Sequence, residues 1–412
     1  MNYEELPEPE KKKKSGFWKG FIGGVIVAVV AMFALSGINR IVKSGGFLNA
    51  VSAQKVLDSQ TEEKIEALAQ YIQGSYYEDV DVETLREGLF RGLFDNLDVY
   101  SQYYTAEEYQ SLYESSVSGT YCGIGASLQQ DAENKSVTIV HVYDGSPAME
   151  AGLQQGDMIL TADGYDATEM DLTEFVSHIR GEENSEVHLV IYRNGEEKEF
   201  DITRKNLVLP TVSHEMMRDQ TGYIDVTEFT DATPKQFTEA LEDLKTQGME
   251  SLIIDLRSNP GGMLTAVCDM LDEILPEGLL VYTEDRAGNR KEYNSTDEAS
   301  LDVPIVVLVD QYSASASEIF AGAIQDRKAG TILGTTTYGK GVVQTIRGLK
   351  DGSAFKVTTN RYFTPGGTCI QDVGIKPDVE LEYEFLGGEN DAYSHELDNQ
   401  IQKALEILND KK

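Results

Sequence analysis

The stretch VPIVVLVDQYSASASEIFAGAIQDR, residues 303–327, decides the fold. It begins as a continuous apolar, β-branched run, which is typical of a strand buried on both faces of a sheet. Alternating serines and alanines then lead into a run that reads as a helix. An equivalent pattern lies upstream, where the helical TPKQFTEALEDLKTQG is followed by the apolar SLIIDL, residues 251–256. Buried strands that alternate with helices predict an α/β core.

The rest of the chain differs from this core in its pattern of apolar and polar residues. Residues 46–118 have helical periodicity, whereas residues 119–205 read as short strands with glycine-rich turns. The α/β pattern occupies residues 206–412 and ends in a helix with an apolar face. That face carries Leu397, Ile401, Leu405 and Leu408. The helical segment, residues 46–118, carries Leu85, Leu89, Leu93 and Leu97 at four-residue spacing. The sequence therefore predicts a helical segment, a β-rich insert and an α/β core.

The N-terminus predicts a membrane anchor. Residues 20–39 carry no charge, and twenty residues in a helix span about 30 Å, one hydrocarbon thickness. Five lysines precede the run and few basic residues closely follow it, so the N-terminal tail, residues 1–19, is expected in the cytoplasm. The later domains are then expected outside the cell membrane, on a single-pass anchor. A cleaved signal peptide ending near ALSG is the alternative, and the length of the run favours the anchor.

Composition excludes several classes of function. The net charge of −35 argues against nucleic acid as a partner, because phosphate-binding surfaces are rich in Lys and Arg. The three cysteines, Cys122, Cys268 and Cys369, form no metal-ligand spacing or disulfide framework, and buried thiols are expected. The five histidines form no HExxH or HxxxH pair. The sequence predicts no metal and no cofactor.

The β-rich insert contains YCGIGASL and, further on, GSPAMEAGLQQGDMILTADG. Glycines let successive backbone N–H groups turn inward and form a nest for a terminal carboxylate. With the second phrase, the loop Gly123, Ile124, Gly125 and Ala126 resembles the carboxylate-binding loop of a PDZ domain. The resemblance implies that residues 119–205 bind a peptide C-terminus beside the strand after the loop, with TEFVSHIRG as the opposite wall. A plain β-sandwich is the alternative.

The stretch GTTTYGKG, residues 334–341, nearly spells a phosphate-binding P-loop, but Gly341 stands where Ser or Thr is required. A β-rich run follows Lys340, whereas a P-loop leads into a helix. The serines of QYSASASEI lie at a strand-to-helix junction, where a nucleophile is exposed and helix amides can stabilise an oxyanion. A serine-rich helix cap is the structural alternative. The stretch DLRSNPGG, residues 255–262, is a second strand that ends in a glycine loop suited to present N–H groups.

Four motifs in order, SNPGG, SASASEI, YGKGVVQ and YFTPGGTCIQDVGIKPD, resemble the carboxy-terminal processing peptidases, the tail-specific proteases of family S41. The resemblance runs from about residue 60 to the end. It implies a crotonase/ClpP-like αβα catalytic core with the inserted PDZ domain. The implied site comprises Ser315 as nucleophile, Lys340 as general base, Gln344 to orient the lysine, Glu318 beside the nucleophile, and the N–H groups of Ala316 and Gly261, or of Gly262, as oxyanion hole. Val99 and Tyr100 replace the family's usual Pro-His, which we expect to affect local packing and leave the Ser–Lys pair untouched.

The chemistry is coherent on the residues alone. No histidine lies in a context that suggests a triad, and a buried lysine whose pKa falls toward neutrality can act as the base. Ser313 and Ser317 are the fallback nucleophiles, and a surface role is the alternative for Lys340. The expected partners are protein or peptide substrates with free C-termini. The sequence does not decide whether the protein forms a homo-oligomer. It also does not decide whether the PDZ domain inhibits the peptidase or only recruits substrates. The rival hypotheses are a non-catalytic PDZ scaffold and a nucleotide binder.

Overall fold

The computed structural model describes residues 55–411 apart from 133, 297–300 and 389–390. The predicted cytoplasmic tail and transmembrane anchor, residues 1–39, lie outside the described residues. In the described part of the chain, no helix is both long and apolar enough to cross a membrane. The chain divides after Arg86 into two units.

The segment that the sequence predicts as helical contains helices and one strand. Helix α2 begins after Asp58, whose side chain accepts a hydrogen bond from the Thr61 N–H. The helices are α2 (Ser59–Ser75), α3 (Val82–Gly92) and α4 (Ala106–Leu112), followed by a π-helix (Tyr113–Ser118). Between α3 and α4 lies strand β1 (Gln102–Tyr104), which pairs antiparallel with strand β18 (Ala354–Phe363). The helical prediction missed this strand, because its partner is about 250 residues away.

The α/β core is built on a six-stranded sheet in the order β10-β11-β12-β15-β16-β19. All neighbours are parallel except β10 and β11. The strands are β10 (Val212–Met216), β11 (Thr221–Val226), β12 (Ser251–Asp255), β15 (Ile305–Val309), β16 (Thr331–Gly334) and β19 (Val379–Glu380). The apolar runs SLIIDL and VPIVVLV thus form β12 and β15, and every residue of these two strands is buried. The prediction of an α/β core is confirmed.

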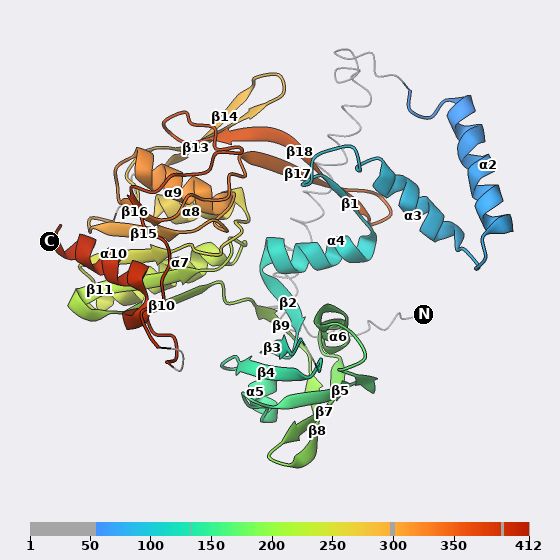
Figure 1. The fold of residues 1–412 in the computed structure, drawn as a ribbon, viewed down its shortest axis with the longest axis horizontal. Helices are drawn as coiled ribbons and strands as arrows, with labels where there is room; N and C mark the ends of the chain where they lie inside the picture. Colours follow the sequence, from blue (N-terminus) through green and yellow to red (C-terminus); the bar gives the residue numbers. More distant parts are fainter. Residues whose placement is uncertain (1–54, 133, 297–300, 389–390, 412) are drawn as a thin grey trace, which may run out of the picture. The chain divides into compact units, whose positions relative to one another are not determined.

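Helices cover both faces of this sheet (Figure 1). On one face, residues such as Ile254 and Val307 pack against α7 (Thr233–Thr246), α8 (Leu264–Asp272) and α9 (Ala316–Asp326). On the other, Ile253 and Val306 pack against α10 (Asn399–Asn409). Successive strand residues point to opposite faces, so a continuous apolar run supplies both layers. Of the predicted C-terminal stripe, Ile401, Leu405 and Leu408 are buried on α10, and Leu397 precedes the helix in a 3₁₀ turn.

A second sheet holds β1 against the core. Its order is β1-β18-β13-β14, and β17 also pairs with β18. The added strands are β13 (Gly278–Asp285), β14 (Arg290–Ser295) and β17 (Val342–Gly348). Val281 of β13 and Tyr362 of β18 join the same apolar cluster as α8 and α9. Tyr362 of β18 also reaches the start of α9, where its hydroxyl lies 3.0 Å from the carbonyl oxygen of Ser315.

The β-rich insert forms its own apolar cluster around Ile139, Phe175 and Leu189. Its main sheet has the order β3-β4-β5-β7-β8, with β6 on β5, and β2 pairs with β9. The elements are β2 (Thr120–Gly123), β3 (Ala126–Gln130), β4 (Val137–Val142), α5 (Pro147–Ala151), β5 (Met158–Ala162), β6 (Tyr165–Asp166), α6 (Leu172–Ile179), β7 (Glu186–Arg193), β8 (Glu196–Thr203) and β9 (Lys205–Val208). β3 is an edge strand of this sheet. An unpaired edge is what an incoming peptide strand needs.

Candidate active site

Ser315 sits on a strained turn between β15 and α9. Its backbone has φ 54° and ψ −109°, a conformation that a residue with a side chain rarely adopts. The turn before it is fixed by Asp310, whose carboxylate accepts from the N–H groups of Tyr312 and Ser313 at 3.0 Å. A strained strand-to-helix turn of this kind exposes the nucleophilic serine of the α/β-hydrolases. Ser315 is partly exposed, whereas both neighbouring serines are buried.

Those neighbouring serines have structural roles. The Ser313 hydroxyl donates to the carbonyl of Leu256 at 2.8 Å, and the Ser317 hydroxyl donates to the carbonyl of Asn259 at 3.0 Å. Neither side chain is exposed at all. The two fallback nucleophiles therefore tie the start of α9 to the glycine loop after β12 and are inaccessible to a substrate.

The glycine loop touches Ser315 closely. A Cβ on Gly261 would lie 2.6 Å from the carbonyl oxygen of Ala314 and 2.8 Å from the Cβ of Ser315, so only glycine fits here. The Gly261 N–H donates to the side-chain oxygen of Asn259 at 2.8 Å. Gly261 therefore cannot supply the expected oxyanion N–H in this structure. Among the described residues, the N–H groups of Ala316 and Gly262 have no hydrogen-bond partner, and they are the pair available for an oxyanion.

Glu318 joins the two key segments from the inside. Its buried carboxylate accepts from the N–H of Ser315 at 2.8 Å and from the N–H of Lys340 at 2.9 Å. It also accepts from the N–H of Gly339 at 2.7 Å and from the hydroxyl of Thr337 at 2.6 Å. Burial raises the pKa of Glu318, while these four donors oppose the rise because they favour the carboxylate. The sequence placed Glu318 beside the nucleophile, and the structure adds that it clamps both backbones.

Tyr362 of β18 links the same two segments through their carbonyl groups. Its hydroxyl lies 3.0 Å from the carbonyl oxygen of Ser315 and 2.5 Å from that of Lys340. Burial raises the pKa of Tyr362 well above its usual value, so the hydroxyl remains a donor. The sequence analysis gave this residue no role, although it is the first residue of the YFTPGGTCIQDVGIKPD motif.

Lys340 lies in the loop between β16 and β17, so a strand follows it and the helix of a P-loop is absent at this position. Gly341 is needed for packing, since a Cβ there would lie 2.4 Å from the backbone nitrogen of Gln371. Burial lowers the pKa of Lys340, and the charge of Lys356 lowers it further, whereas Glu318 and Asp98 raise it. The net shift favours the neutral amine, which a general base requires.

The Lys340 amino group lies 4.7 Å from the centroid of the Tyr100 ring, within the range of a cation–π contact. The expectation that the Val99-Tyr100 departure leaves the Ser–Lys pair untouched is therefore wrong. The strand β1, which the helical prediction missed, follows Tyr100 and holds this segment on β18. No hydrogen bond joins Ser315 Oγ to Lys340 Nζ among the described residues.

Gln344 lies on β17, four residues after Lys340. Its side-chain amide donates to the Thr358 hydroxyl on β18 at 3.1 Å. This bond fixes the Gln344 side chain on β18, and among the described residues Gln344 makes no hydrogen bond to Lys340. The role predicted for Gln344, to orient the lysine, stays a prediction.

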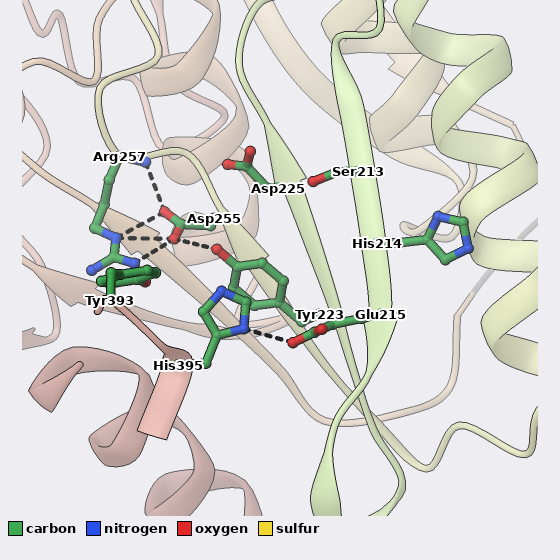
Figure 2. A pocket seen from close by; sticks show the side chains of 9 residues that line it. All are labelled: Ser213, His214, Glu215, Tyr223, Asp225, Asp255, Arg257, Tyr393 and His395. Carbon is green, nitrogen blue, oxygen red and sulfur yellow. Dashed lines mark hydrogen bonds and ion pairs between the residues drawn. The ribbon is translucent and has the colours of Figure 1, made fainter. Parts of the chain in front are cut away.

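A separate polar pocket of about 390 Å³ lies beside the beginning of the glycine loop (Figure 2). Arg257 bonds Asp255 at 2.6 to 3.0 Å, and it reaches Asp398 and Gln400 near α10 at 2.9 Å. Tyr223 donates to Asp255 at 2.8 Å. Ser315 and Lys340 do not line this pocket. Arg257 thus anchors the glycine loop to the C-terminal helix.

The predicted carboxylate loop of the insert connects β2 to β3. Ile124 is buried, Gly125 has φ 81°, and Ala126 begins the edge strand β3. The carbonyl of Ile124 accepts from the Ala148 N–H at 2.8 Å, which fixes the loop on α5. In the described part of the chain, the N–H groups of Ile124 and Gly125 have no hydrogen-bond partner. Two free N–H groups beside an open strand edge suit a terminal carboxylate.

The three cysteines are free, and each is partly buried, where buried thiols were expected. Burial raises the pKa of Cys268 to about 12, so this thiol is unreactive at neutral pH. No group of three His, Cys, Asp or Glu side chains among the described residues could hold a metal ion.

Comparison with known proteins agrees with this geometry. The profile of Peptidase family S41 matches residues 220–381, and that of the PDZ domain matches residues 122–203. A carboxyl-terminal-processing protease of Synechocystis sp. is 37% identical over 308 residues, which cover 73% of this chain and 71% of that protein. A "Probable CtpA-like serine protease" of Staphylococcus aureus is 32% identical over 375 residues, 90% of this chain and 73% of that protein.

Among solved structures, an S41 protein of Bacteroides fragilis superposes with a TM-score of 0.51 at 18% identity, covering 87% of this chain and 99% of that one. That likeness supports the fold alone. The sequence relatives carry the assignment, because the identity exceeds 30% over more than two thirds of their length. The chain therefore belongs to peptidase family S41 and is a serine peptidase with a PDZ domain.

Proposed function

We propose that the protein is a membrane-anchored endopeptidase that processes the C-terminal tails of proteins, with Ser315 as nucleophile and neutral Lys340 as general base. One observation carries the proposal. The buried Glu318 carboxylate accepts hydrogen bonds from the N–H groups of both residues and so holds the two segments together. The fallback serines are buried and occupied.

The proposed reaction follows acyl-transfer chemistry. Lys340 Nζ takes the proton from Ser315 Oγ as that oxygen attacks the peptide carbonyl. The N–H groups of Ala316 and Gly262 stabilise the resulting oxyanion. The ammonium then returns its proton to the leaving amine, which departs and leaves an ester on Ser315. Water, deprotonated by Lys340, hydrolyses this ester and regenerates the free serine.

Substrate capture is assigned to the PDZ domain. Its loop offers the N–H groups of Ile124 and Gly125 to a carboxylate, and β3 offers an open edge for the peptide backbone. The name of the Synechocystis relative, a carboxyl-terminal-processing protease, supports this substrate class. The proposed anchor, residues 20–39, would place the peptidase on the outer side of the cell membrane, because the lysines precede it.

The test compares four forms of the full chain in detergent micelles on an unfolded polypeptide with an apolar C-terminus. We expect Ser315→Ala and Lys340→Met to lose cleavage by at least about 100-fold, the usual scale for a nucleophile or base. The matched control is Lys350→Met, which removes an exposed lysine and should cleave as the wild type does.

A second arm uses the same polypeptide with an amidated C-terminus. A free carboxylate is the group that the PDZ loop recognises, so amidation should raise KM several-fold. Full cleavage by Ser315→Ala would refute the nucleophile. Equal KM for the free and amidated polypeptides would refute tail recognition.

A further inference from the structure

The backbone of Lys340 is fixed on both sides, whereas its amino group contacts an aromatic ring and makes no hydrogen bond to the described residues. The N–H donates to Glu318, and the carbonyl accepts from Tyr362. Only side-chain rotation can therefore move the amino group. It lies over Tyr100, and it makes no hydrogen bond to Ser315 or Gln344 among the described residues.

The position of Tyr100 is built into the second sheet. Its N–H donates to the Asp98 carboxylate at 2.9 Å, which closes a turn before β1. The Ser101 hydroxyl donates to the same carboxylate at 3.1 Å and accepts from the Thr358 N–H at 3.1 Å. Thr358 also binds Gln344. The backbone at Tyr100 and Ser101 is thus fixed on β18, the strand that carries Tyr362 and pairs with β17.

We infer that Tyr100 is a positioning residue for the general base: its ring holds the ammonium form of Lys340 away from Ser315, and the amine reaches Ser315 once it has lost its proton. The inference rests on the proposed function of Lys340. It adds a residue and a resting position to that mechanism. An aromatic face attracts an ammonium and has little attraction for a neutral amine, so proton loss and release from the ring are coupled.

The charged groups around Lys340 and its burial together determine the pKa of its amino group. Glu318 and Asp98 favour the ammonium, Lys356 disfavours it, and burial disfavours it most. Tyr100 is itself a neutral phenol in the working range, because burial raises its pKa. Its ring therefore acts on the Lys340 ammonium through the quadrupole of its face, while its hydroxyl interacts with Tyr338. A desolvated cation–π contact of this kind should hold the pKa of Lys340 about one unit higher than it would otherwise be.

The test keeps the shape of the ring and weakens its quadrupole. The full chain is made with phenylalanine at position 100, and then with mono-, di- and trifluorophenylalanine. Two quantities are measured: the acid limb of the pH profile of kcat/KM, and the pKa of Lys340 from lysine labelled with ¹³C at Cε. The ¹³C signal of Lys340 is assigned by its loss in the Lys340→Arg variant.

We expect Tyr100→Phe to match the wild type and each added fluorine to lower both values, by about one pH unit over the series. Fluorination at Tyr104 is the matched control. That ring also lies under a lysine, with Lys356 Nζ 5.5 Å from its centroid. The control series should leave the acid limb and the pKa of Lys340 unchanged.

If added fluorines at position 100 leave the pKa of Lys340 unchanged, or raise it, the inference is overturned. The ¹³C titration does not depend on turnover. If the wild type fails to cleave, or Ser315→Ala cleaves equally well, the proposed function fails. The titration then still decides whether Tyr100 holds the ammonium.

Discussion

At the scale of single residues, the Glu318 carboxylate joins the backbones of Ser315 and Lys340, the proposed nucleophile and base. It is three residues from Ser315 and over twenty from Lys340, yet it binds both N–H groups. The sequence could name the residue types, because serine, lysine and glycine motifs are local. It could not reveal that Tyr100 and Tyr362 contact Lys340, since those contacts depend on how β1 and β18 are placed.

Gly261 offers a prediction at the same scale. In Gly261→Ala, the new Cβ would strike the Ala314 carbonyl and Ser315 Cβ, and φ 104° would add strain. We expect kcat to fall about 10²- to 10³-fold, the cost of disturbing an oxyanion hole. Steady-state kinetics and the unfolding midpoint measure this effect.

The control for that variant is Gly288→Ala, which also has a positive φ but open space around the Cβ. It should lose roughly 1 kcal/mol of stability and keep its kcat. Equal kcat in the two variants would show that the contact between Gly261 and Ser315 is unimportant.

At the scale of elements, the parallel register of β11 and β12 decides the charge balance beneath the glycine loop. It places Asp225 directly beside Asp255 (Figure 2). Burial and the Asp255 charge raise the pKa of Asp225 to about 6, against the opposing effects of Arg257 and His395. The strands themselves were predictable from their apolar runs. Their register was not, because it is set by packing across the whole sheet.

A pH dependence of stability follows from this pair. A carboxyl whose pKa is raised by folding stabilises the fold only while protonated, so its contribution is complete below about pH 4 and is lost as pH rises through 6. In Asp225→Asn this loss is absent. We expect the variant to gain about 2–3 kcal/mol over the wild type between pH 4 and pH 7.

Urea unfolding at fixed pH values measures that difference. Asp302→Asn removes the same charge from an exposed position and should keep the wild-type pH dependence. A difference between Asp225→Asn and the wild type that stays constant from pH 4 to pH 7 would show that Asp225 has an ordinary pKa in the folded protein.

At the scale of the whole molecule, the family and the two kinds of domain were predictable from the sequence. Four motifs in a fixed order identify the peptidase, and one glycine-rich phrase identifies the PDZ domain. The strand β1 was not predictable from the sequence, because it is only three residues long and gains its partner strand only in the folded chain. The local prediction for Gly261 failed for a related reason, since the side chain of Asn259 turns back onto its N–H.

The most direct test of the central claim is to locate the nucleophile chemically. The full chain in micelles is treated with a fluorophosphonate, digested, and the adduct is placed by tandem mass spectrometry. The account predicts an adduct on Ser315 alone, formed about 10²- to 10⁴-fold more slowly in Lys340→Met. An adduct on Ser313 or Ser317, or an unchanged rate in Lys340→Met, would contradict it.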